Sequence, residues 1–352
     1  MQNIAIIYQA QLPPIKNGIQ KPMKSGGYSD SGADIAYELI RNGLEVITPI
    51  ENPNIENDKD WVFPDTEKGI QDALKKGANT FWLNTVLYEN HPIESFFDRD
   101  IRFVGQIPSK VDIFDDKYFT NELLRKNQIP IPKCELILLG NLTDQSINIG
   151  FPMVVKPIRG RDSQGVFLVR SQKELNLKLN EIFSNKIYGN AVYVERYLSG
   201  QEITITVMPA GIYTIEDRSI EFVEHWCLPA VRRFNHKDGI APYNGIVAVI
   251  KNSSVLENSE LNSAKIIEVS HHCERAAKML NIKAPIRIDC RADENGNYFL
   301  FDLNMKPNMT GPSRPQRQNQ DSLTLMAARK IGWTYFDLLK NMLEQDWKAS
   351  CQ

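Results

Sequence analysis

The first third of the chain alternates short apolar runs with segments whose apolar residues recur every three or four positions. The run Ile4–Tyr8 has the length of a buried strand, and residues 31–43 place Ala33, Ala36 and Leu39 at helical spacing before Gly43. The same alternation predicts strands within 44–50, 79–86 and 101–106 and a helix at 66–77. Alternating strands and helices favour parallel pairing, so we expect a small doubly wound α/β domain.

Between the first strand and the first helix lies a stretch rich in Pro, Gly and Lys, residues 9–32. It is long for a connection inside a compact domain, which predicts either a functional lid or a disordered segment.

The pattern changes after residue 107. Residues 112–132 predict a helix, with Lys117 near its start and Pro130 beyond its end. Two strands within 151–160 and 165–171 are joined by a short turn, and a helix at 171–185 and a strand at 191–198 follow. Ser171 is the expected cap of that helix, with Glu174 at the capping-box position. These elements predict a compact α+β unit.

The last part is rich in strands. Residues 202–209 alternate strictly between polar and apolar, 240–250 predict a further strand, and 284–304 predict a hairpin that turns at 294–297. Helices are expected at 260–281, 322–332 and 334–345.

Composition narrows the class of protein. The chain has 352 residues, 42% hydrophobic and 24% charged, enough for two or three globular domains. A net charge of −2 argues against a nucleic-acid partner, because such proteins usually carry a basic excess. The five cysteines are scattered and lack a C-x-x-C pair, and no segment has the length of a membrane span. We therefore expect a cytoplasmic protein with reduced thiols and no membrane partner.

Chemistry-bearing residues gather on the hairpin at 284–304. Arg287 and Asp289 are two residues apart, as are Asp302 and Asn304 on the partner strand, so each pair shares a face. If the two faces coincide, three oxygen donors and an Arg converge, a set that suits Mg²⁺. The alternative is an exposed sheet face with a salt bridge between Arg287 and an Asp.

Three further features point to phosphate chemistry. Lys156 ends an apolar strand, where a lysine is costly to bury without an anion. The turn Gly160–Gly165 could present backbone N–H groups to a phosphate, although it is equally a solvated hairpin tip. Glu195 and Glu202 flank the end of the next strand, where backbone and a carboxylate could bind adenine and ribose, or are two surface glutamates.

In this order the motifs resemble the ATP-grasp enzymes, and within them the D-alanine–D-alanine ligase-like group. The resemblance covers nearly the whole chain and rests on Lys117, "VVKP", the Gly-rich turn, "VER-L" followed by "GQEIT", "R-I-D", "D-L-N" and "P-N-M-T". It implies a three-domain α/β (α+β) fold. The implied domains are an N-terminal pre-ATP-grasp domain at 1–112, a central lid subdomain at 113–198 and a C-terminal catalytic domain at 199–352.

The resemblance also implies roles for single residues. Lys117 and Lys156 would neutralise ATP phosphates, and Arg287, with Lys156, would act in catalysis at the developing oxyanion. Asp289, Asp302 and Asn304 would hold two Mg²⁺ ions, or Mn²⁺. The nucleotide would also be bound by the lid turn and by the segment after it, namely Gly160, Arg161, Asp162, Ser163, Gly165, Glu195, Arg196, Tyr197, Leu198 and Glu202.

Departures from the family pattern concern the substrate. The family places a Glu before the first helix, where this chain has only Asp30, and Lys306 and Asn308 replace small residues. The loop at 311–322 adds Arg314 and Arg317, which could hold an anionic group of the acceptor or form a solvated basic loop. Candidate substrate residues are Asn308, Thr310, Arg314, Arg317 and Ser322.

The resulting functional expectation is a Mg-ATP-dependent carboxylate–amine ligase that forms a peptide or amide bond through an acyl phosphate. The alternatives are a true D-alanine–D-alanine ligase and a nucleotide-binding protein without catalysis. By the resemblance, the expected partners are a carboxylate donor and an amine acceptor, both amino-acid-like, and the same resemblance allows a homodimer.

Overall fold

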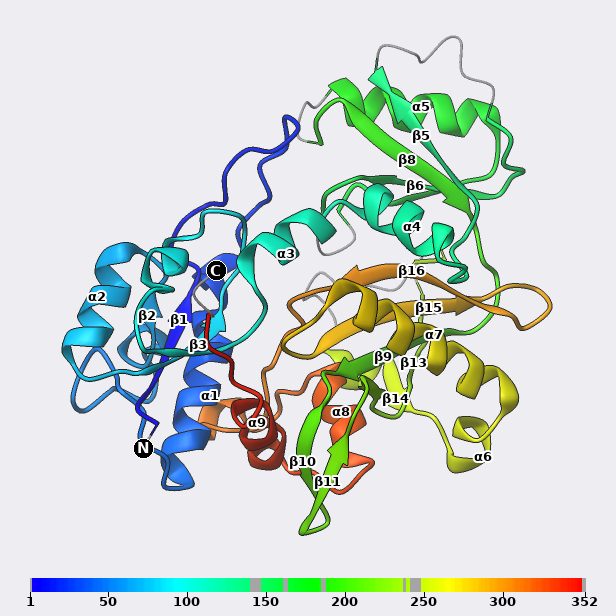
Figure 1. Ribbon diagram of the computed structural model, residues 1–352. Helices are drawn as coiled ribbons and strands as arrows, with labels where there is room; N and C mark the ends of the chain where they lie inside the picture. The colour runs from blue at the N-terminus through cyan, green and yellow to red at the C-terminus, as the bar shows by residue number, and fades with distance from the viewer. Residues whose placement is uncertain are drawn as a thin grey trace.

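The computed structural model describes residues 2–139, 147–160, 164–184, 188–236, 239–240 and 248–349. Its strands form three larger sheets and one two-stranded ribbon, with helices packed against them (Figure 1). In this view the first sheet lies at the left, the second at the upper right, and the third below the second.

The first sheet is parallel, with the order β2-β1-β3-β4. Its strands and helices are β1 (Ile4–Tyr8), β2 (Phe63–Pro64), β3 (Thr80–Asn84), β4 (Arg102–Val104), α1 (Ser29–Arg41) and α2 (Glu67–Lys75), with 3-10 turns at Ser25–Tyr28, Asp58–Asp60 and Pro92–Phe96. The strand expected within 44–50 is wrong: only Val46 pairs there, in a single bridge to Ile4. The doubly wound pattern otherwise follows the prediction, because the strands are apolar and buried on both faces.

A tight turn before α1 depends on glycine. Gly27 has φ +58°, and a Cβ added there would lie 1.8 Å from the carbonyl oxygen of Gln9. We predict that Gly27→Ala lowers the free energy of unfolding by more than about 2 kcal/mol, since the clash adds to the cost of a left-handed alanine.

The matched control is Gly43→Ala, where φ is +81° but no atom lies within 4 Å of the added Cβ. That variant should lose only about 1 kcal/mol in urea denaturation, the cost of conformation alone. Equal losses in the two variants would contradict the argument from close approach.

The stretch at 9–32 reaches from the first sheet to the second. Ile19 is buried beside Ile158 and Tyr193, while Lys16 and Lys21 form ion pairs with Asp112 and Asp115. The long connection thus contacts both parts of the chain (Figure 1).

The second sheet is antiparallel, with the order β5-β8-β6-β7. Its elements are β5 (Cys134–Leu138), β6 (Met153–Pro157), β7 (Phe167–Val169), β8 (Ala191–Arg196) and α5 (Gln172–Ser184), preceded by α3 (Pro108–Phe114) and α4 (Lys117–Lys126). The single helix expected at 112–132 is wrong. The first helix ends at Phe114, and Asp116 caps the second by accepting from Phe119 N at 2.9 Å, so Lys117 is the first residue of α4.

The cap of α5 follows the prediction only in part. Ser171 Oγ accepts from Glu174 N at 3.3 Å, but Glu174 Oε2 accepts from Arg170 N rather than from the N–H of Ser171.

The third sheet has the order β14-β13-β9-β15-β16, with β12 also paired to β9. Its strands are β9 (Glu202–Met208), β12 (Trp226–Cys227), β13 (Val231–Arg233), β14 (Ser253–Val255), β15 (Ile286–Ala292) and β16 (Tyr298–Asn304), and β10 (Gly211–Ile215) pairs with β11 (Arg218–Phe222). The helices are α6 (Asn258–Leu261), α7 (Ala264–Leu280), α8 (Leu323–Arg329) and α9 (Tyr335–Leu343), with 3-10 turns at Val249–Lys251 and Pro315–Arg317. The helix expected at 260–281 is interrupted at residues 262–263, and most of the strand expected at 240–250 lies outside the described residues.

Helices cover both faces of β9, so its polar and its apolar positions are both buried. Ile203, Ile205 and Val207 pack in the core cluster that includes α7, while Thr206 on the other face contacts Thr324 of α8 at 3.1 Å between hydroxyl oxygens. All seven residues of β9 are buried, so the polar positions of the pattern are internal rather than solvent-facing.

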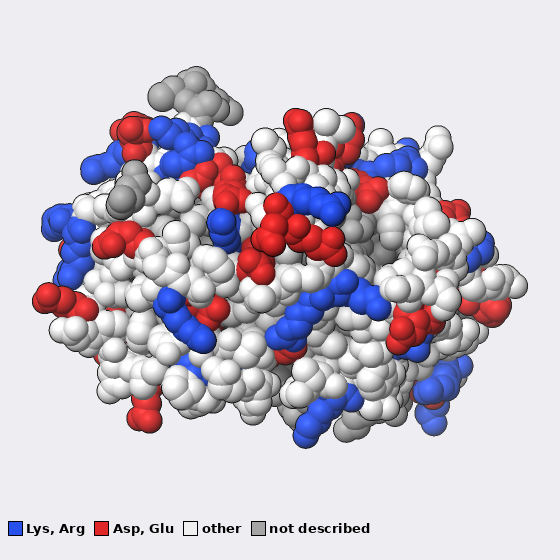
Figure 2. All heavy atoms as spheres, turned by 90° about the horizontal axis from the view of Figure 1, so that it is seen from below, with Lys and Arg blue, Asp and Glu red and all other residues white. Residues whose placement is uncertain are grey.

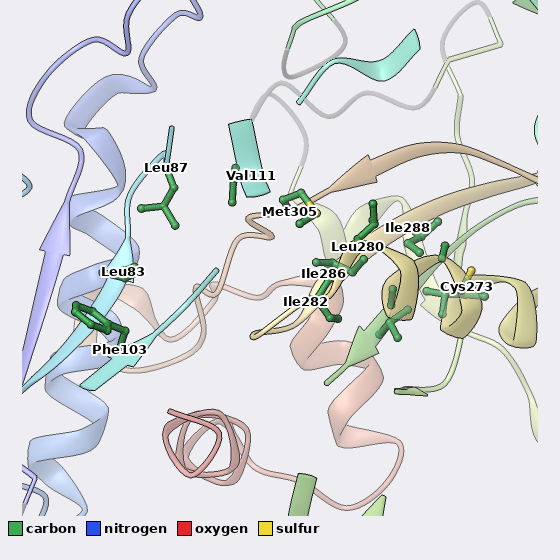
Figure 3. Close-up of a cluster of buried hydrophobic side chains, with 14 of the residues drawn as sticks. Leu83, Leu87, Phe103, Val111, Cys273, Leu280, Ile282, Ile286, Ile288 and Met305 are labelled. Carbon is green, nitrogen blue, oxygen red and sulfur yellow. The ribbon is translucent and has the colours of Figure 1, made fainter. Parts of the chain in front are cut away.

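One hydrophobic cluster joins the first and third sheets. Leu83, Leu87 and Phe103 come from the first part of the chain, and Ile286 and Met305 from the third (Figure 3). Leu87 and Met305 also line a cleft between these parts of the chain, so this cluster holds two walls of that cleft in place.

Surface charge is mixed. Basic and acidic side chains are interspersed over the face shown in Figure 2, in keeping with the net charge of −2. No helix within the described residues combines the length and apolar character needed to cross a membrane.

Candidate active site

A cleft of about 220 Å³ is lined by strand residues of the second and third sheets and by residues outside the strands in the first part of the chain. Its walls include α4 and β6 with the end of β8, the hairpin β15–β16, and the loops that follow β3. Most of the residues expected to bind nucleotide and metal lie here.

The hairpin brings the predicted metal residues together. Asp289 on β15 pairs with Asp302 on β16, and Arg287 pairs with Asn304. The hairpin turn is held by Asp293 Oδ1, which accepts from the N–H groups of Asn295 and Asn297 at 2.9 Å, and a register shift between Asp289 and Cys290 brings Asp289 opposite Asp302. All four side chains line the cleft, so the two faces coincide, a point that the spacing alone left open.

The two aspartates have different electrostatic surroundings. Burial alone would raise the pKa of Asp302, but Lys117, Lys156 and Arg287 together lower it, and Lys117 forms an ion pair with it. Burial raises the pKa of Asp289, opposed by Arg287, whose Nε lies 3.4 Å from Oδ1.

Thr204 on β9 donates its hydroxyl to Asp289 Oδ1 at 2.7 Å. A carboxylate so held cannot rotate freely, which favours a fixed ligand geometry.

Lys156 and Glu195 form a buried ion pair, with Nζ 2.7 Å from Oε1. Lys156 Nζ also donates to the carbonyl oxygen of Phe301 at 3.1 Å, which ties β6 to the hairpin. Burial raises the pKa of Glu195, and the lysine opposes this. The sequence separated these two residues into a phosphate role and an adenine role, whereas the structure brings them into contact.

Glu202 lies beside a residue that the sequence reasoning missed. Arg291 Nη1 lies 3.5 Å from Glu202 Oε2, and His236 Nε2 lies 2.8 Å from the same oxygen. Arg291 also donates to the Tyr197 hydroxyl at 3.0 Å. The signal was available, because Arg291 continues the face of β15 that carries Arg287 and Asp289.

Comparison with known proteins identifies the family. The sequence model described as "D-ala D-ala ligase C-terminus" matches residues 123–344, well over half of the chain. The chain belongs to this family.

Relatives and solved structures agree with that membership. D-alanine--D-alanine ligases from Francisella philomiragia subsp. philomiragia and Francisella tularensis subsp. novicida are 24% and 26% identical, over 70% and 65% of this chain and 71% and 67% of theirs. D-alanine--D-alanine ligase from Bacillus anthracis complexed with ATP superposes with a TM-score of 0.64 at 18% identity, covering 98% of this chain and 96% of that one. VanG D-Ala:D-Ser ligase from Enterococcus faecalis gives 0.65 at 14%, covering 98% and 99%.

Membership in the D-ala D-ala ligase C-terminus family confirms the resemblance stated from the sequence. The chain is an ATP-dependent ligase of the ATP-grasp class, and the expected mixed α/β fold is confirmed by the superpositions.

The turn Gly160–Gly165, expected from the sequence to contact phosphates, is described only at its edges. Gly160 and Gln164 line the cleft, and Gly165 has φ +72°. The predicted contacts of Arg161, Asp162 and Ser163 lie outside the described residues. Arg196 ends β8, Tyr197 and Leu198 follow it, and all three line the cleft.

The predicted substrate residues lie elsewhere. None of Asn308, Thr310, Arg314, Arg317 and Ser322 is among the described residues that line the cleft. Arg314 is completely buried, and Arg314 and Arg317 both form ion pairs with Asp34 of α1. Ser322 caps α8 by accepting from Leu325 N at 3.2 Å. The sequence suggested that Arg314 either binds substrate or lies in a solvated loop. Neither interpretation is supported, because its guanidinium is buried and paired with Asp34.

The donor set suits magnesium. Within the described residues, no group of three or more His, Cys, Asp and Glu side chains could hold a metal ion alone. Asp289, Asp302 and the amide oxygen of Asn304 are hard oxygen donors, which fits an ion that keeps much of its shell for water and phosphate.

Proposed function

We propose that this protein is a Mg-ATP-dependent carboxylate–amine ligase that forms a peptide or amide bond through an acyl phosphate and releases ADP and phosphate. The observation that carries the proposal is the convergence of Arg287, Asp289, Asp302 and Asn304 on one wall of a cleft whose other wall carries Lys117 and Lys156. Phosphoryl transfer depends on positioning and charge neutralisation, which these residue types supply.

The nucleotide would occupy the part of the cleft beside β6 and the end of β8. Lys117 and Lys156 would contact its phosphates, and the segment 195–198 would meet the adenine. Glu202 would bind the ribose, with Arg291 and His236 holding its carboxylate in one orientation. In the present arrangement Lys117 neutralises Asp302, so nucleotide and metal would rearrange this ion pair.

Asp289, Asp302 and Asn304 would hold Mg²⁺, as two ions, with Mn²⁺ as a substitute. When bound, the metal neutralises charge on the transferred phosphoryl group. Thr204 keeps Asp289 oriented, and Asn304 Oδ1 accepts from Lys306 N at 3.0 Å, which fixes the amide oxygen at the end of β16.

Arg287 would stabilise the oxyanion that forms when the amine attacks the acyl phosphate. Its guanidinium lies beside Asp289 and is mostly buried, so it can be positioned before reaction. Loss of one such donor typically costs about 3 kcal/mol of transition-state stabilisation. An acyl phosphate hydrolyses readily, so the turn at 160–165 would close over the cleft and exclude water.

The domain boundaries at 112/113 and 198/199 are part of the same proposal. They are supported by the three large sheets, whose described strands fall within 4–104, 134–196 and 202–304. A cleft lined from all three parts would then open and close as the domains move.

Incubation with Mg-ATP and pooled D- and L-amino acids tests the function. We expect release of ADP and phosphate together with a product whose mass equals two substrates joined with loss of water. Chelation of Mg²⁺ with EDTA should stop both, because the proposed metal residues act only with the ion. Turnover with D-alanine alone would favour the activity named for the relatives, and an unlike pair would favour a different ligase. ATP binding without any substrate-dependent phosphate release would overturn the proposal.

A further inference from the structure

The cleft contains a lysine that the nucleotide does not require. Lys306 follows Asn304 by two residues and lines the cleft together with Tyr28, Val86 and Leu87 from the first part of the chain. Because Asn304 is a proposed metal residue, Lys306 lies next to the reacting end of the cleft rather than at the adenine end.

Two neighbours from the first part of the chain help to position the Lys306 ammonium. Its Nζ lies 3.4 Å from the centre of the Tyr28 ring and 3.2 Å from Asn84 Oδ1. Asn84 is buried, and its Nδ2 donates to the carbonyl oxygen of Tyr28 and to Ser31 Oγ, so its oxygen must face the lysine. The ammonium is therefore held in place at the wall of the cleft.

Tyr28 is itself held by the tight turn before α1. Its φ is +67°, it follows Gly26 and Gly27 in the same left-handed region, and Gly27 packs directly against Gln9. A bulky residue in this conformation is costly and persists only where its surroundings enforce it. The turn therefore fixes the position of the Tyr28 ring that contacts Lys306.

The carboxylates of the cleft cannot easily serve a substrate ammonium group. Five described carboxylates line it, and each lies within 4 Å of a cationic or imidazole side chain: Asp115 with Lys21, Glu195 with Lys156, Glu202 with Arg291, Asp289 with Arg287, and Asp302 with Lys117. Near Lys306 the described walls are instead apolar or aromatic, from Tyr28, Val86, Leu87 and Met305. This region favours a substrate with an apolar body and a negative group.

We propose that Lys306 is a specificity-determining residue that binds a second carboxylate of the substrate, so that the enzyme acts on a dicarboxylic acid or an acidic amino acid. This inference rests on the proposed ligase function and names the substrate class of the same cleft. A lysine held over an aromatic ring presents its N–H groups to such a carboxylate, and the contact is charge-assisted.

Binding of small acids to the full chain tests the proposal without requiring turnover. The chain, saturated with Mg²⁺ and a non-hydrolysable ATP analogue, is titrated with succinate, with aspartate and glutamate of both configurations, and with alanine and lysine. We expect at least one acid to bind about tenfold or more tightly than alanine, and Lys306→Met to remove that preference. Lys306→Arg should retain it, and Lys306→Glu should favour lysine instead.

Lys75→Met is the matched control, because it removes the same charge from an exposed helix position. It should leave every affinity unchanged, and melting curves of all variants check that the fold is intact. Alanine binding as tightly as every acid, or an acid preference that survives in Lys306→Met, would overturn the inference. Failure of the analogue to bind would instead count against the ligase function, and the acid preference is then measured in the same titration without nucleotide.

Discussion

Replacement of Asp302 by Ala should lower kcat by about a thousandfold or more while leaving the protein folded. Asp302 is at once a proposed metal residue and the ion-pair partner of Lys117, opposite Asp289 on the hairpin. Without its carboxylate the metal loses a ligand and the phosphoryl group loses charge neutralisation. The fold should survive because the Asp302 side chain is 34% exposed and Lys117 can be hydrated in its absence. Initial rates of phosphate release at varied Mg²⁺ concentration measure the effect.

Asp302→Asn refines the result, since it keeps the size and one oxygen of the side chain but not the charge. It should require a higher Mg²⁺ concentration and remain slower than the unchanged chain. Asp98→Ala, an exposed position far along the chain, is the control and should retain full activity. Near-normal kcat in Asp302→Ala would refute the assignment of this residue to the metal.

The hairpin could be predicted from sequence because its geometry is local. Alternation along a strand places Arg287 with Asp289 and Asp302 with Asn304, but the register shift between Asp289 and Cys290, which brings the two faces together, leaves no signal in that alternation. The same periodicity located β9, although it did not show that helices cover both faces and bury its threonines. Family membership adds the order of the motifs but not their contacts.

Contacts between distant segments could not be predicted in this way. Lys306 meets Tyr28 across 277 intervening residues, and Arg314 meets Asp34 across 279, because tertiary packing and not local pattern decides these pairs. A local side-chain hydrogen bond also made one helix prediction wrong. The apolar spacing suggested one continuous helix, but the Asp116 side chain caps a second helix inside that segment. Val46 lies in an apolar run with strand character, yet it pairs only once.

A second large effect is expected from Asp34, the buried carboxylate of α1. Its oxygens accept from Thr310 Oγ1 at 2.7 Å, Ser313 Oγ at 2.8 Å, Arg317 Nη2 at 2.8 Å and Arg314 Nη2 at 3.1 Å. This one side chain therefore fastens the segment after β16, which includes the turn carrying Lys306, to the first part of the chain.

Asp34→Ala should lower the free energy of unfolding by about 3 kcal/mol, because Arg314 and Arg317 lose their shared carboxylate. The loss is at the low end for a broken buried ion pair because Arg314 keeps Asp58 and Arg317 keeps Asp30. Urea denaturation measures the loss. Asp34→Asn should be nearly as unstable, since an amide in that place turns an N–H₂ group toward guanidinium donors. Glu45→Ala, at an exposed position just after the same helix, should change stability by no more than about 0.5 kcal/mol. A loss below about 1 kcal/mol in Asp34→Ala would show that the segment is held by packing and that the buried ion pairs contribute little to its position.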